Sequence, residues 1–414
     1  MSDAHADGAA PTGAPDTRPR LLHLTTTDMS LDWLLGPQLC AFADAGYEVI
    51  GASAPGPHVD HLTAAGIRHI AVPSLTRAAD PLADVRALIA LWRLCRRERP
   101  DIVHTHNPKP GVLGRIAARL AGVPLVVNTQ HGLWAQPTDR RRRRWPVYTI
   151  ERIAATCSHA ELVQNPEDLA TLVDRLHVPA RRVHLLGNGI DLARFTRTPA
   201  ITDAAQHLRA EWIADAPADT PVIGVVGRLV AEKGIPEVLA AAHLLHERGI
   251  AVRVVVIGPA DPDKPDALDP ALVRQATVEG VRFVGQRTDM PACYAAMDVF
   301  VTASRREGFP RAAMEAAAMG LPIVATDIRG NRQVVIDGET GALVPLDDPT
   351  ALAAAIERLV TARDRWPDLQ RAARQLAEST FDQQWVIERT LAVYRTLGAR
   401  RTRRRDRQRA QPRR

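Results

Sequence analysis

Short runs of apolar residues recur along the chain, and most of them end in a polar or glycine-containing turn. Each run is followed by a stretch in which apolar residues recur every three or four positions, which is typical of a helix. Continuous apolar strands that alternate with helices indicate a parallel sheet covered on both faces. The first half of the chain predicts seven such strands, at 21–25, 48–53, 68–72, 102–106, 125–130, 161–164 and 182–186.

The pattern is interrupted over 198–221, a polar segment that contains prolines, and then begins again. The second half predicts six strands and three closing helices. The strands fall at 222–226, 253–257, 281–284, 298–302, 322–326 and 341–344, and the helices at 350–362, 366–378 and 382–397. Two doubly wound α/β halves place a ligand-binding cleft outside the carboxyl ends of the strands.

These observations predict a chain of two Rossmann-like domains, since 414 residues suffice for two or three domains of about 150 residues. We expect a disordered segment at 1–19, a first domain at 20–198 and a second domain at 199–380. A helix at 381–398 is expected to pack back on the first domain, and a basic disordered tail follows at 399–414.

The charge is unevenly distributed. Lys and Arg number 53 against 47 Asp and Glu, a net charge of +6. Nine arginines and one aspartate lie between 400 and 414, and five consecutive arginines lie at 140–144, so the rest of the chain is mildly acidic. A mildly acidic body with two basic segments argues against a broad nucleic-acid-binding face and for local electrostatic attachment.

Cysteine usage and hydropathy predict a location. The four cysteines lie far apart without a CxxC pair, which is typical of free thiols in a reducing compartment. The first twenty residues lack the apolar core of a secretion signal, and no run of about 18 apolar residues could span a bilayer. We therefore expect a cytoplasmic protein that is at most peripheral, at the inner face of the membrane.

The first candidate for chemistry is VVGRLVAEKG at 225–234. A strand is expected to end at Gly227, with Arg228 and Lys233 in the following loop and Gly234 just before a helix. Two cations beside a helix N-terminus suit a diphosphate, because the side-chain charges and the backbone N–H groups act together. A solvated surface loop would carry the same residues, so this stretch alone leaves both interpretations open.

The second candidate is SRREGFPRAAMEAAAMGLP at 304–322. Glu307 is expected in the mouth of a loop and Glu315 about two turns further along, inside a helix that begins near Pro310. The alternative is that Glu307 is only a helix-dipole partner and that Glu315 is an exposed residue paired with Arg311. By itself this stretch favours the alternative at least as much as a functional role.

The two motifs together, Gly-Arg-x4-Lys-Gly and Glu-x7-Glu, resemble the retaining family-4 glycosyltransferases of the GT-B fold. Further matches lie in the expected order over about 20–398: NGID at 188–191, Gly285 with Arg287 and Asp289, DVFVTAS at 298–304 and DGETGALV at 337–344. Three more stretches are similar to the branch that builds polysaccharides and lipid-linked oligosaccharides: HTHNPKPG at 104–111, TQHG at 129–132 and TDIRGNR at 326–332. Two departures are the glycine-free loop TTTDMS at 25–30 and Gln333, where relatives often have Glu.

The resemblance implies roles for individual residues. Arg228 and Lys233 would hold the donor diphosphate, Glu315 the ribose hydroxyls, and Glu307 the donor sugar. The loop around Gly285 and Arg287 would meet the base, and His131 would face the donor sugar or the reacting centre. The implied catalytic residues are His131, Arg228, Lys233 and Glu307, and the implied donor-binding residues are Gly227, Arg228, Lys233, Gly285, Arg287, Glu307, Gly308, Phe309, Pro310, Arg311 and Glu315.

The implied reaction is sugar transfer with retention from a nucleotide sugar, most simply a UDP-hexose or UDP-N-acetylhexosamine, to a glycan or a polyprenyl-diphosphate-linked acceptor. No cofactor is implied beyond the donor substrate. Two alternatives stay open: a sugar-nucleotide epimerase or phosphorylase on a similar scaffold, and a non-catalytic nucleic-acid binder that uses the arginine runs.

No metal site is expected. Asp261 and Asp263 have a D-x-D spacing, but they lie in DPDKPDALDP at 261–270, which is typical of a solvated turn. His104 and His106 alternate at a strand end, and the neighbouring sequence offers no third ligand. Both histidines are interpreted as structural or as substrate contacts.

The arginine run TDRRRRRWPVY at 138–148 follows soon after His131. Arginines attract anionic lipid, and Trp134, Trp145 and Tyr148 suit the headgroup layer. We expect a membrane contact that brings a lipid-linked acceptor to the site, with a plain solvated loop as the alternative. The residues expected in that contact are Trp134, Arg140, Arg141, Arg142, Arg143, Arg144 and Trp145.

Overall fold

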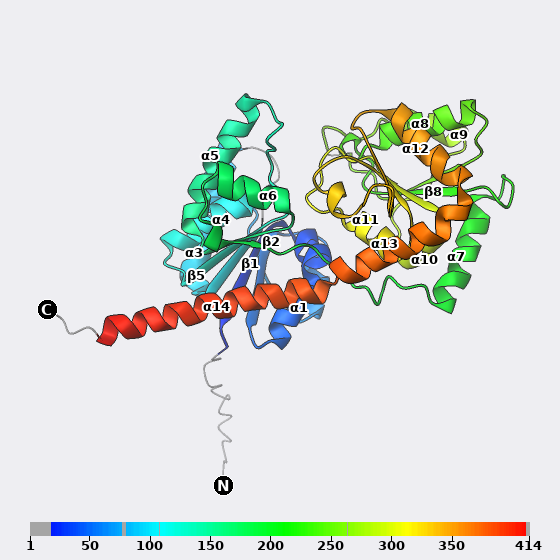
Figure 1. Ribbon diagram of the computed structural model, residues 1–414. Coiled ribbons are helices and arrows are strands. Elements are labelled where there is room, and N and C mark those ends of the chain that lie inside the picture. The colour runs from blue at the N-terminus through cyan, green and yellow to red at the C-terminus, as the bar shows by residue number, and fades with distance from the viewer. Residues whose placement is uncertain (1–17, 77–79, 107, 263, 411–414) are drawn as a thin grey trace, which may run out of the picture. The chain divides into compact units, whose positions relative to one another are not determined.

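The computed structural model describes residues 18–76, 80–106, 108–262 and 264–410, which are organised around two parallel sheets (Figure 1). The first sheet has seven strands in the order β3-β2-β1-β4-β5-β6-β7. Its strands are β1 (Arg20–Thr27), β2 (Glu48–Ala54), β3 (Arg68–Ala71), β4 (Ile102–His106), β5 (Leu125–Gln130), β6 (Ala160–Val163) and β7 (Val183–Leu185). All seven lie where the apolar runs predicted them.

The helices of this half lie between the strands. They are α1 (Gly36–Asp44), α2 (Val59–Ala64), α3 (Pro81–Glu98), α4 (Lys109–Leu120), α5 (Arg141–Cys157) and α6 (Pro166–Ala170), with short turns η1 (Ser30–Leu34), η2 (Thr171–Arg175) and η3 (Ala180–Arg182). The sheet is buried because α3 and α4 pack against each other and carry apolar faces toward it. A cluster of Leu, Ile, Val and Ala side chains from these helices and from β1, β2, β4 and β5 forms the first core.

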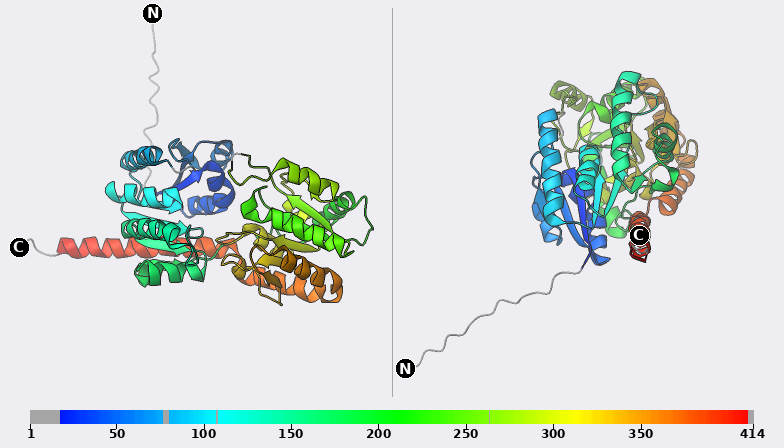
Figure 2. Two further views of the ribbon diagram at one scale, coloured as in Figure 1. Left: turned by 90° about the horizontal axis from the view of Figure 1, so that it is seen from above. Right: turned by 90° about the vertical axis from the view of Figure 1, so that its left-hand side faces the viewer.

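The second sheet has six strands in the order β10-β9-β8-β11-β12-β13. They are β8 (Val222–Val226), β9 (Arg253–Ile257), β10 (Arg282–Phe283), β11 (Val299–Thr302), β12 (Ile323–Thr326) and β13 (Gly341–Val344). The helices are α7 (Pro199–Trp212), α8 (Ile235–Glu247), α9 (Pro270–Val278), α10 (Met290–Ala295), α11 (Arg311–Ala318), α12 (Pro349–Thr361), α13 (Trp366–Thr380) and α14 (Gln383–Ala410), with turns η4 (Ala231–Lys233), η5 (Asn331–Gln333) and η6 (Arg363–Arg365). Figure 2 shows the same elements from two further directions.

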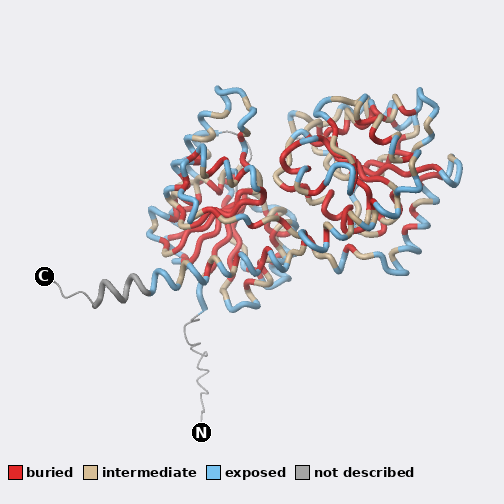
Figure 3. The backbone as a smooth tube through the Cα atoms, viewed as in Figure 1, coloured by how far each residue is buried: buried red, intermediate tan, exposed pale blue. Residues whose placement is uncertain are grey.

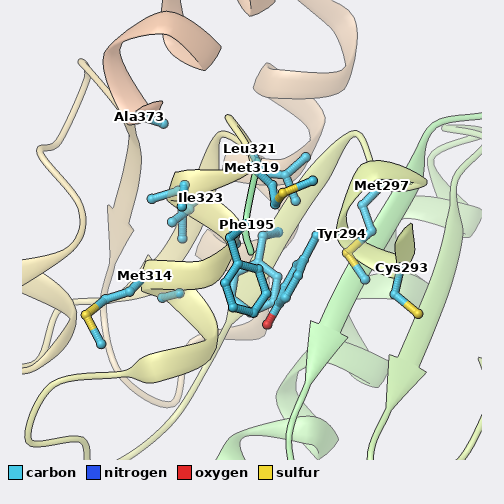
Figure 4. Close-up of a cluster of buried hydrophobic side chains, with 14 of the residues drawn as sticks. Phe195, Cys293, Tyr294, Met297, Met314, Met319, Leu321, Ile323 and Ala373 are labelled. Atoms are coloured by element: carbon cyan, nitrogen blue, oxygen red, sulfur yellow. The ribbon is translucent and has the colours of Figure 1, made fainter. Parts of the chain in front are cut away.

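Each face of the second sheet has its own core. On one face Phe195 meets Tyr294 edge to face, with ring centroids 6.0 Å apart, near Met314 of α11 and near Met297 and Met319, which follow α10 and α11 (Figure 4). The other face packs against α8 and α12. Figure 3 shows that the inner strands are buried along most of their length, as expected for continuous apolar strands in a parallel sheet, whereas the edge strands β3 and β10 have no buried residue.

Many helices begin with a capping residue followed by proline. Asp80 accepts hydrogen bonds from two backbone N–H groups at the start of α3, and Thr198, Asp269 and Asp348 cap α7, α9 and α12 in the same way. The side chain satisfies free N–H groups, and the proline that follows has a fixed φ suited to the first turn. These starts are therefore encoded locally.

The strand order reverses at two places, between β1 and β4 and between β8 and β11. Such a reversal separates the loops that leave the carboxyl ends of two neighbouring strands and opens a place for a ligand. The predicted fold class, two doubly wound Rossmann-like halves, is confirmed.

Residue contacts divide the chain into two compact units. The first comprises the chain up to Asn128 together with Ile153–His159, and the second comprises Thr129–Arg152 and Ala160–Arg414. The first sheet ends at Leu185 and the second begins at Val222, on either side of the polar segment where the sequence placed its domain boundary. Residues 1–17 of the segment predicted to be disordered lie outside the described residues.

The C-terminal end differs from expectation. Helix α14 continues to Ala410, so residues 399–410 are helical rather than disordered, and residues 411–414 of the expected tail lie outside the described residues. Arginine is a good helix former, and no proline interrupts the run before Pro412. Near the start of α14, Arg389 Nη1 donates to the Leu186 carbonyl at 3.3 Å. Within the described part of the chain, no helix is both long enough and apolar enough to cross a bilayer.

Candidate active site

The two candidate motifs meet because β8 and β11 are neighbours. The loop of residues 227–234 leaves β8, and the loop of residues 303–310 leaves β11, at the same edge of the sheet. Gly234 has φ +68°, and a Cβ there would lie 2.0 Å from the Ala303 carbonyl oxygen. Only glycine fits this left-handed, crowded position at the start of α8. The loops therefore touch at a position that the sequence marks with glycine.

Both predicted phosphate-binding cations are held by carboxylates. Lys233 Nζ lies 2.6 Å from Glu307 Oε1, which joins the two motifs directly. Arg228 donates to the carboxylate of Asp261, a residue expected in a solvated turn. That expectation is wrong for Asp261, because the end of β9 brings it beside β8; Asp263 lies outside the described residues.

Glu315 is buried beneath the loop, and the alternative of an exposed helix position is wrong. It accepts hydrogen bonds from Tyr294 Oη at 3.0 Å and from Arg311 Nε at 3.0 Å, so the expected pair with Arg311 is present. Burial, followed by the charge of Glu315, raises the pKa of Tyr294 well above its ordinary value, which keeps the hydroxyl a donor. Helix α11 begins at Arg311, and Pro310 precedes it as the N-cap residue.

The loop predicted to meet a base is tied to the end of β9. The Gly285 carbonyl accepts from the Gly258 N–H at 2.8 Å, and Gly285 has φ +70°. Arg287 binds Asp289 through both nitrogens of its fork, with Nε 2.8 Å from Oδ1. The hydrogen bond and charge of Asp289 raise the pKa of Arg287 above its ordinary value, so the loop presents a fixed cation.

His131 follows β5 and lies against the second motif. A Cβ on Gly308 would be 1.9 Å from the His131 carbonyl oxygen, and one on Gly132 would be 2.7 Å from Gly308 Cα. Gln164 Nε2 lies 3.1 Å from His131 Nδ1. Desolvation lowers the pKa of His131 to about 4, so its imidazole is neutral at physiological pH. Two facing glycines thus set His131 beside the loop that carries Glu307.

A pair of residues that sequence reasoning missed holds these loops together. Arg329 donates from Nη1 to Asp168 at 2.6 Å and from Nη2 to the Leu133 carbonyl, and Asp168 accepts from the Leu133 N–H at 3.1 Å. Asn165 bonds both Asp168 and the Gly308 carbonyl, at 2.9 and 3.2 Å. In the sequence, only the TDIRGNR stretch and the Asn-Pro start of α6 pointed to these residues, and neither pattern shows that Arg329 pairs with Asp168.

Residues from several of these loops line a cleft of about 500 Å³ within the second unit. Six cations and three carboxylates surround it, which favours an anionic ligand. The cations are Arg143, Arg228, Lys233, Arg305, Arg306 and Arg329, and the carboxylates are Glu232, Asp266 and Glu307. His131, Gly308 and Trp134 also line the cleft, whereas Glu315 and Arg287 are not among the lining residues.

The arginine run is a helix rather than a loop. Four of its five arginines, Arg141 to Arg144, form the first turn of α5, and Pro146 lies inside the helix just after that turn. Arg143 lines the cleft, and Arg144 donates to the Pro137 carbonyl. Trp134 and Trp145 are 60% and 66% exposed, as an interfacial contact requires. Tyr148 differs, because its hydroxyl oxygen is buried and so does not face outward.

His104 and His106 do have a third partner, which corrects that expectation. Strand β1 places His23 opposite His104, and the nitrogens of all three buried histidines lie within 4.8 Å of one another. The ring of His106 stacks on those of His104 and His23, at 23° and 21°, whereas the rings of His23 and His104 are tilted by 42°. Ring nitrogens bind metals in the ring plane, so stacked rings do not aim at one ion. The 3.1 Å contact of His23 Nδ1 with His106 Nε2 instead forms a hydrogen bond between buried imidazoles.

The fold and the site together define a GT-B glycosyltransferase. Residues 220–362 match the model of the family described as glycosyl transferases group 1, and residues 37–189 match the glycosyl transferase 4-like domain. The chain belongs to this family-4-like group of glycosyltransferases.

Two relatives and one solved structure illustrate the match. UDP-Gal:alpha-D-GlcNAc-diphosphoundecaprenol alpha-1,3-galactosyltransferase of Escherichia coli is 33% identical over 305 residues, 73% of this chain and 77% of that protein. The capsular polysaccharide biosynthesis glycosyltransferase CapM of Staphylococcus aureus is 28% identical, over 76% of this chain and 82% of that protein. The fold resembles Anabaena Alr3699/HepE in complex with UDP and glucose, with a TM-score of 0.72, 19% identity and coverage of 90% and 98%. Neither the epimerase nor the nucleic-acid binder gains support from these relatives.

Proposed function

We propose that this enzyme transfers a hexose from a UDP-sugar, with retention, to a sugar carried on a polyprenyl diphosphate, as a step of cell-surface polysaccharide synthesis. The observation that carries the proposal is the contact between Lys233 and Glu307 in a cation-rich cleft. A sugar diphosphate needs cations for its phosphates and, beside them, a carboxylate that accepts hydrogen bonds from the sugar hydroxyls. The Escherichia coli relative, named for a UDP-galactose donor and a diphosphoundecaprenol acceptor, supports the choice of substrates.

The donor would replace the carboxylates that now hold the two cations. The diphosphate would bind Arg228 in place of Asp261 and Lys233 in place of Glu307. The Glu307 carboxylate would then accept hydrogen bonds from the sugar hydroxyls. Because Lys233 already lines the cleft, its ammonium group would have to move little to stabilise the charge that develops on the leaving group. Glu315, oriented by Tyr294, would receive the ribose hydroxyls.

The proposed reaction is a displacement on one face of the sugar. The acceptor hydroxyl attacks the anomeric carbon on the face from which the diphosphate departs, and the bond from that carbon to the β-phosphate oxygen breaks with its electron pair staying on UDP. The hydroxyl proton passes to that phosphate oxygen, so UDP and the glycoside are the products. Arg228 and Lys233 would stabilise the departing charge, and neutral His131 would hydrogen-bond a sugar hydroxyl without taking the proton.

A donor and acceptor screen tests this proposal. UDP-galactose, UDP-glucose, UDP-N-acetylglucosamine and GDP-mannose are each offered with a short-chain N-acetylglucosaminyl diphosphate lipid or with free N-acetylglucosamine. We expect release of UDP that requires the lipid acceptor, and an axial glycoside by NMR. Equal turnover with free sugar, or turnover only from GDP-mannose, would contradict the proposed substrates.

Variants locate the reaction in the cleft. Arg228→Ala and Glu315→Gln are each expected to lower kcat/KM for the UDP-sugar by on the order of 10²-fold. Arg371→Ala is the matched control, because Arg371 is an exposed arginine on α13 that forms a surface ion pair with Asp368. If the cleft variants behaved like the control, the donor-site assignment would be wrong.

The basic start of α5 supports a location at the inner face of the membrane. Arg140, Arg141 and Arg142 are exposed beside Trp134 and Trp145, a combination that suits anionic headgroups. A lipid-linked acceptor would thereby arrive close to the cleft, which Arg143 and Trp134 line.

Vesicle co-sedimentation tests this contact. Replacing Arg140, Arg141 and Arg142 by Gln spares Arg143 in the cleft and Arg144 on the Pro137 carbonyl. We expect weaker binding to phosphatidylglycerol vesicles, and no loss when the exposed arginines 274, 358 and 371 are replaced instead. Equal binding of both variants would remove α5 from the membrane contact.

A further inference from the structure

Helix α3 has a buried face and an unusual exposed one. Ala87, Leu91, Leu94 and Cys95 enter the first core, as expected for an amphipathic helix over a sheet. The opposite face also carries large apolar side chains at intervals of three, four and three residues, which place them in one stripe. They are Leu82, Val85, Ile89 and Trp92, exposed by 71%, 55%, 42% and 40%. Figure 2 (right) shows α3, in sky blue, along the outer side of its sheet.

The charges of α3 are sorted as well. Arg86, Arg93 and Arg96 are exposed on the side that carries the apolar stripe. Both acidic residues of the helix are engaged elsewhere: Asp84 pairs with Lys109 at 2.5 Å, and Glu98 is buried and pairs with Arg68 and Arg97. The exposed face of α3 is therefore apolar and cationic, without an acidic residue.

A contiguous apolar patch on a soluble surface marks an interaction site, and its composition indicates the partner. Tryptophan and aliphatic side chains beside arginines are typical of a helix that lies in the plane of a bilayer, with the apolar groups among the acyl chains and the guanidinium groups on lipid phosphates. A second copy of the chain fits less well. A two-fold interface sets the same patch against itself and would bring three arginines of each copy together.

We propose that the exposed face of α3 is a membrane-docking surface that inserts Leu82, Val85, Ile89 and Trp92 into an anionic lipid surface. The inference extends the proposed membrane location of the acceptor and adds apolar insertion to the electrostatic contact of α5. Insertion supplies what charge alone does not, namely attachment that persists at high salt, because apolar burial is not screened by ions.

Vesicles of equal parts phosphatidylglycerol and phosphatidylcholine provide the test with the full chain. The double variant Ile89→Gln with Trp92→Gln is expected to bind at least about ten-fold more weakly, since two large apolar side chains no longer leave water. Replacing Arg86, Arg93 and Arg96 by Gln is expected to weaken binding to these vesicles and to make the remaining binding less sensitive to salt than that of the wild type, with the arginines of α5 accounting for the sensitivity that is left. Both changes lie on the exposed face, so the thermal unfolding temperature should stay close to that of the wild type.

The matched control replaces two exposed apolar residues outside α3, Val278 and Leu346, by Gln. This control should bind vesicles like the wild type. Unchanged binding of the α3 double variant, or an equal loss in the control, would overturn the proposal. Sedimentation velocity tests whether a second copy of the chain covers the exposed face of α3 instead. If the wild type were a dimer that the α3 substitutions dissociate, the partner of this face would be a second copy and not lipid.

The proposed function and this surface can fail separately. UDP release with a short-chain, water-soluble acceptor should be equal in the wild type and the α3 variants, because α3 contributes no residue to the cleft. Vesicle binding that depends on α3 in a protein that releases no UDP would keep the surface and reject the proposed reaction. Normal sugar transfer by a protein whose vesicle binding does not depend on α3 would keep the proposed reaction and reject the α3 surface.

Discussion

Arg329 Nη1 lies 2.6 Å from Asp168 Oδ1, and both side chains are buried. The pair joins α6 to the loop after β12, and the same guanidinium reaches the carbonyls of Leu133 and Glu307, with Nε 3.5 Å from the latter. Burial raises the pKa of Asp168, although the charge of Arg329 opposes that shift. The ion pair therefore stands between the His131 loop and the Glu307 loop and acts by positioning both.

Asp168→Asn removes one charge and leaves the buried Arg329 without its counter-ion. We expect a loss of about 3 kcal/mol or more in the free energy of unfolding, because an uncompensated buried charge is costly. The measurement is urea unfolding together with the kinetics of UDP release, and KM for the donor should rise as the loops loosen. Asp327→Asn is the control on the same loop, since its pair with Arg332 is exposed and should change stability by less than about 1 kcal/mol. Similar losses of unfolding free energy in both variants would show that the buried Arg329–Asp168 pair contributes no more to stability than an exposed pair.

Lys233→Ala should lower kcat for sugar transfer by on the order of 10²-fold, because the ammonium would be lost where the departing diphosphate gains charge. Glu307→Gln keeps the lysine and should raise KM for the donor sugar with a smaller effect on UDP binding itself. Lys264→Ala, a lysine of the 261–270 loop outside the cleft lining, is the control. Isothermal titration with UDP and steady-state kinetics separate the two effects. An active Lys233→Ala enzyme would contradict the assignment.

Gly308→Ala should disrupt the site through contact alone. The added Cβ would lie 1.9 Å from the His131 carbonyl oxygen, so the two loops would have to separate. We expect loss of most transfer activity with a lower unfolding temperature. Gly398→Ala is the matched control, because nothing lies within 4 Å of its Cβ position in α14 and alanine is the better helix former. Full activity of Gly308→Ala would show that the loops do not need this approach.

The buried imidazole of His23 predicts a pH dependence of stability. Burial lowers the pKa of His23 to about 3, below its ordinary value of 6.5, so the unfolded chain binds more protons between these values. Stability is therefore full above about pH 6.5 and falls as pH is lowered, by about 1.4 kcal/mol per pH unit for this one group.

Urea unfolding between pH 7 and pH 5 measures this slope. His23→Gln should reduce the slope of the free energy of unfolding against pH. Parallel curves for the wild type and His23→Gln would show that His23 is not the group responsible.

The local pattern of the chain determined most of the fold. Thirteen apolar runs predicted thirteen strands because a strand buried on both faces must be apolar throughout, and the capping residues followed by proline marked helix starts such as Asp80 and Thr198. The two loop motifs could likewise be read from the sequence, since Arg228 and Lys233 keep the spacing of Gly-Arg-x4-Lys-Gly, whereas their donor-binding role stays a prediction. The helix at the arginine run was missed, because a charge run resembles a solvated loop unless neighbouring segments support it.

What the sequence alone determined is the alternation of strands and helices, the two loops at the ends of β8 and β11, and the residue types at their tips. Only the tertiary structure decided the partners: Asp261 for Arg228, Tyr294 for Glu315, His23 for His106, and Asp168 for Arg329. Members of these pairs stand 21 to 161 positions apart. No local propensity selects among so many candidates, because the choice depends on which strands become neighbours and on which buried charges must then be satisfied.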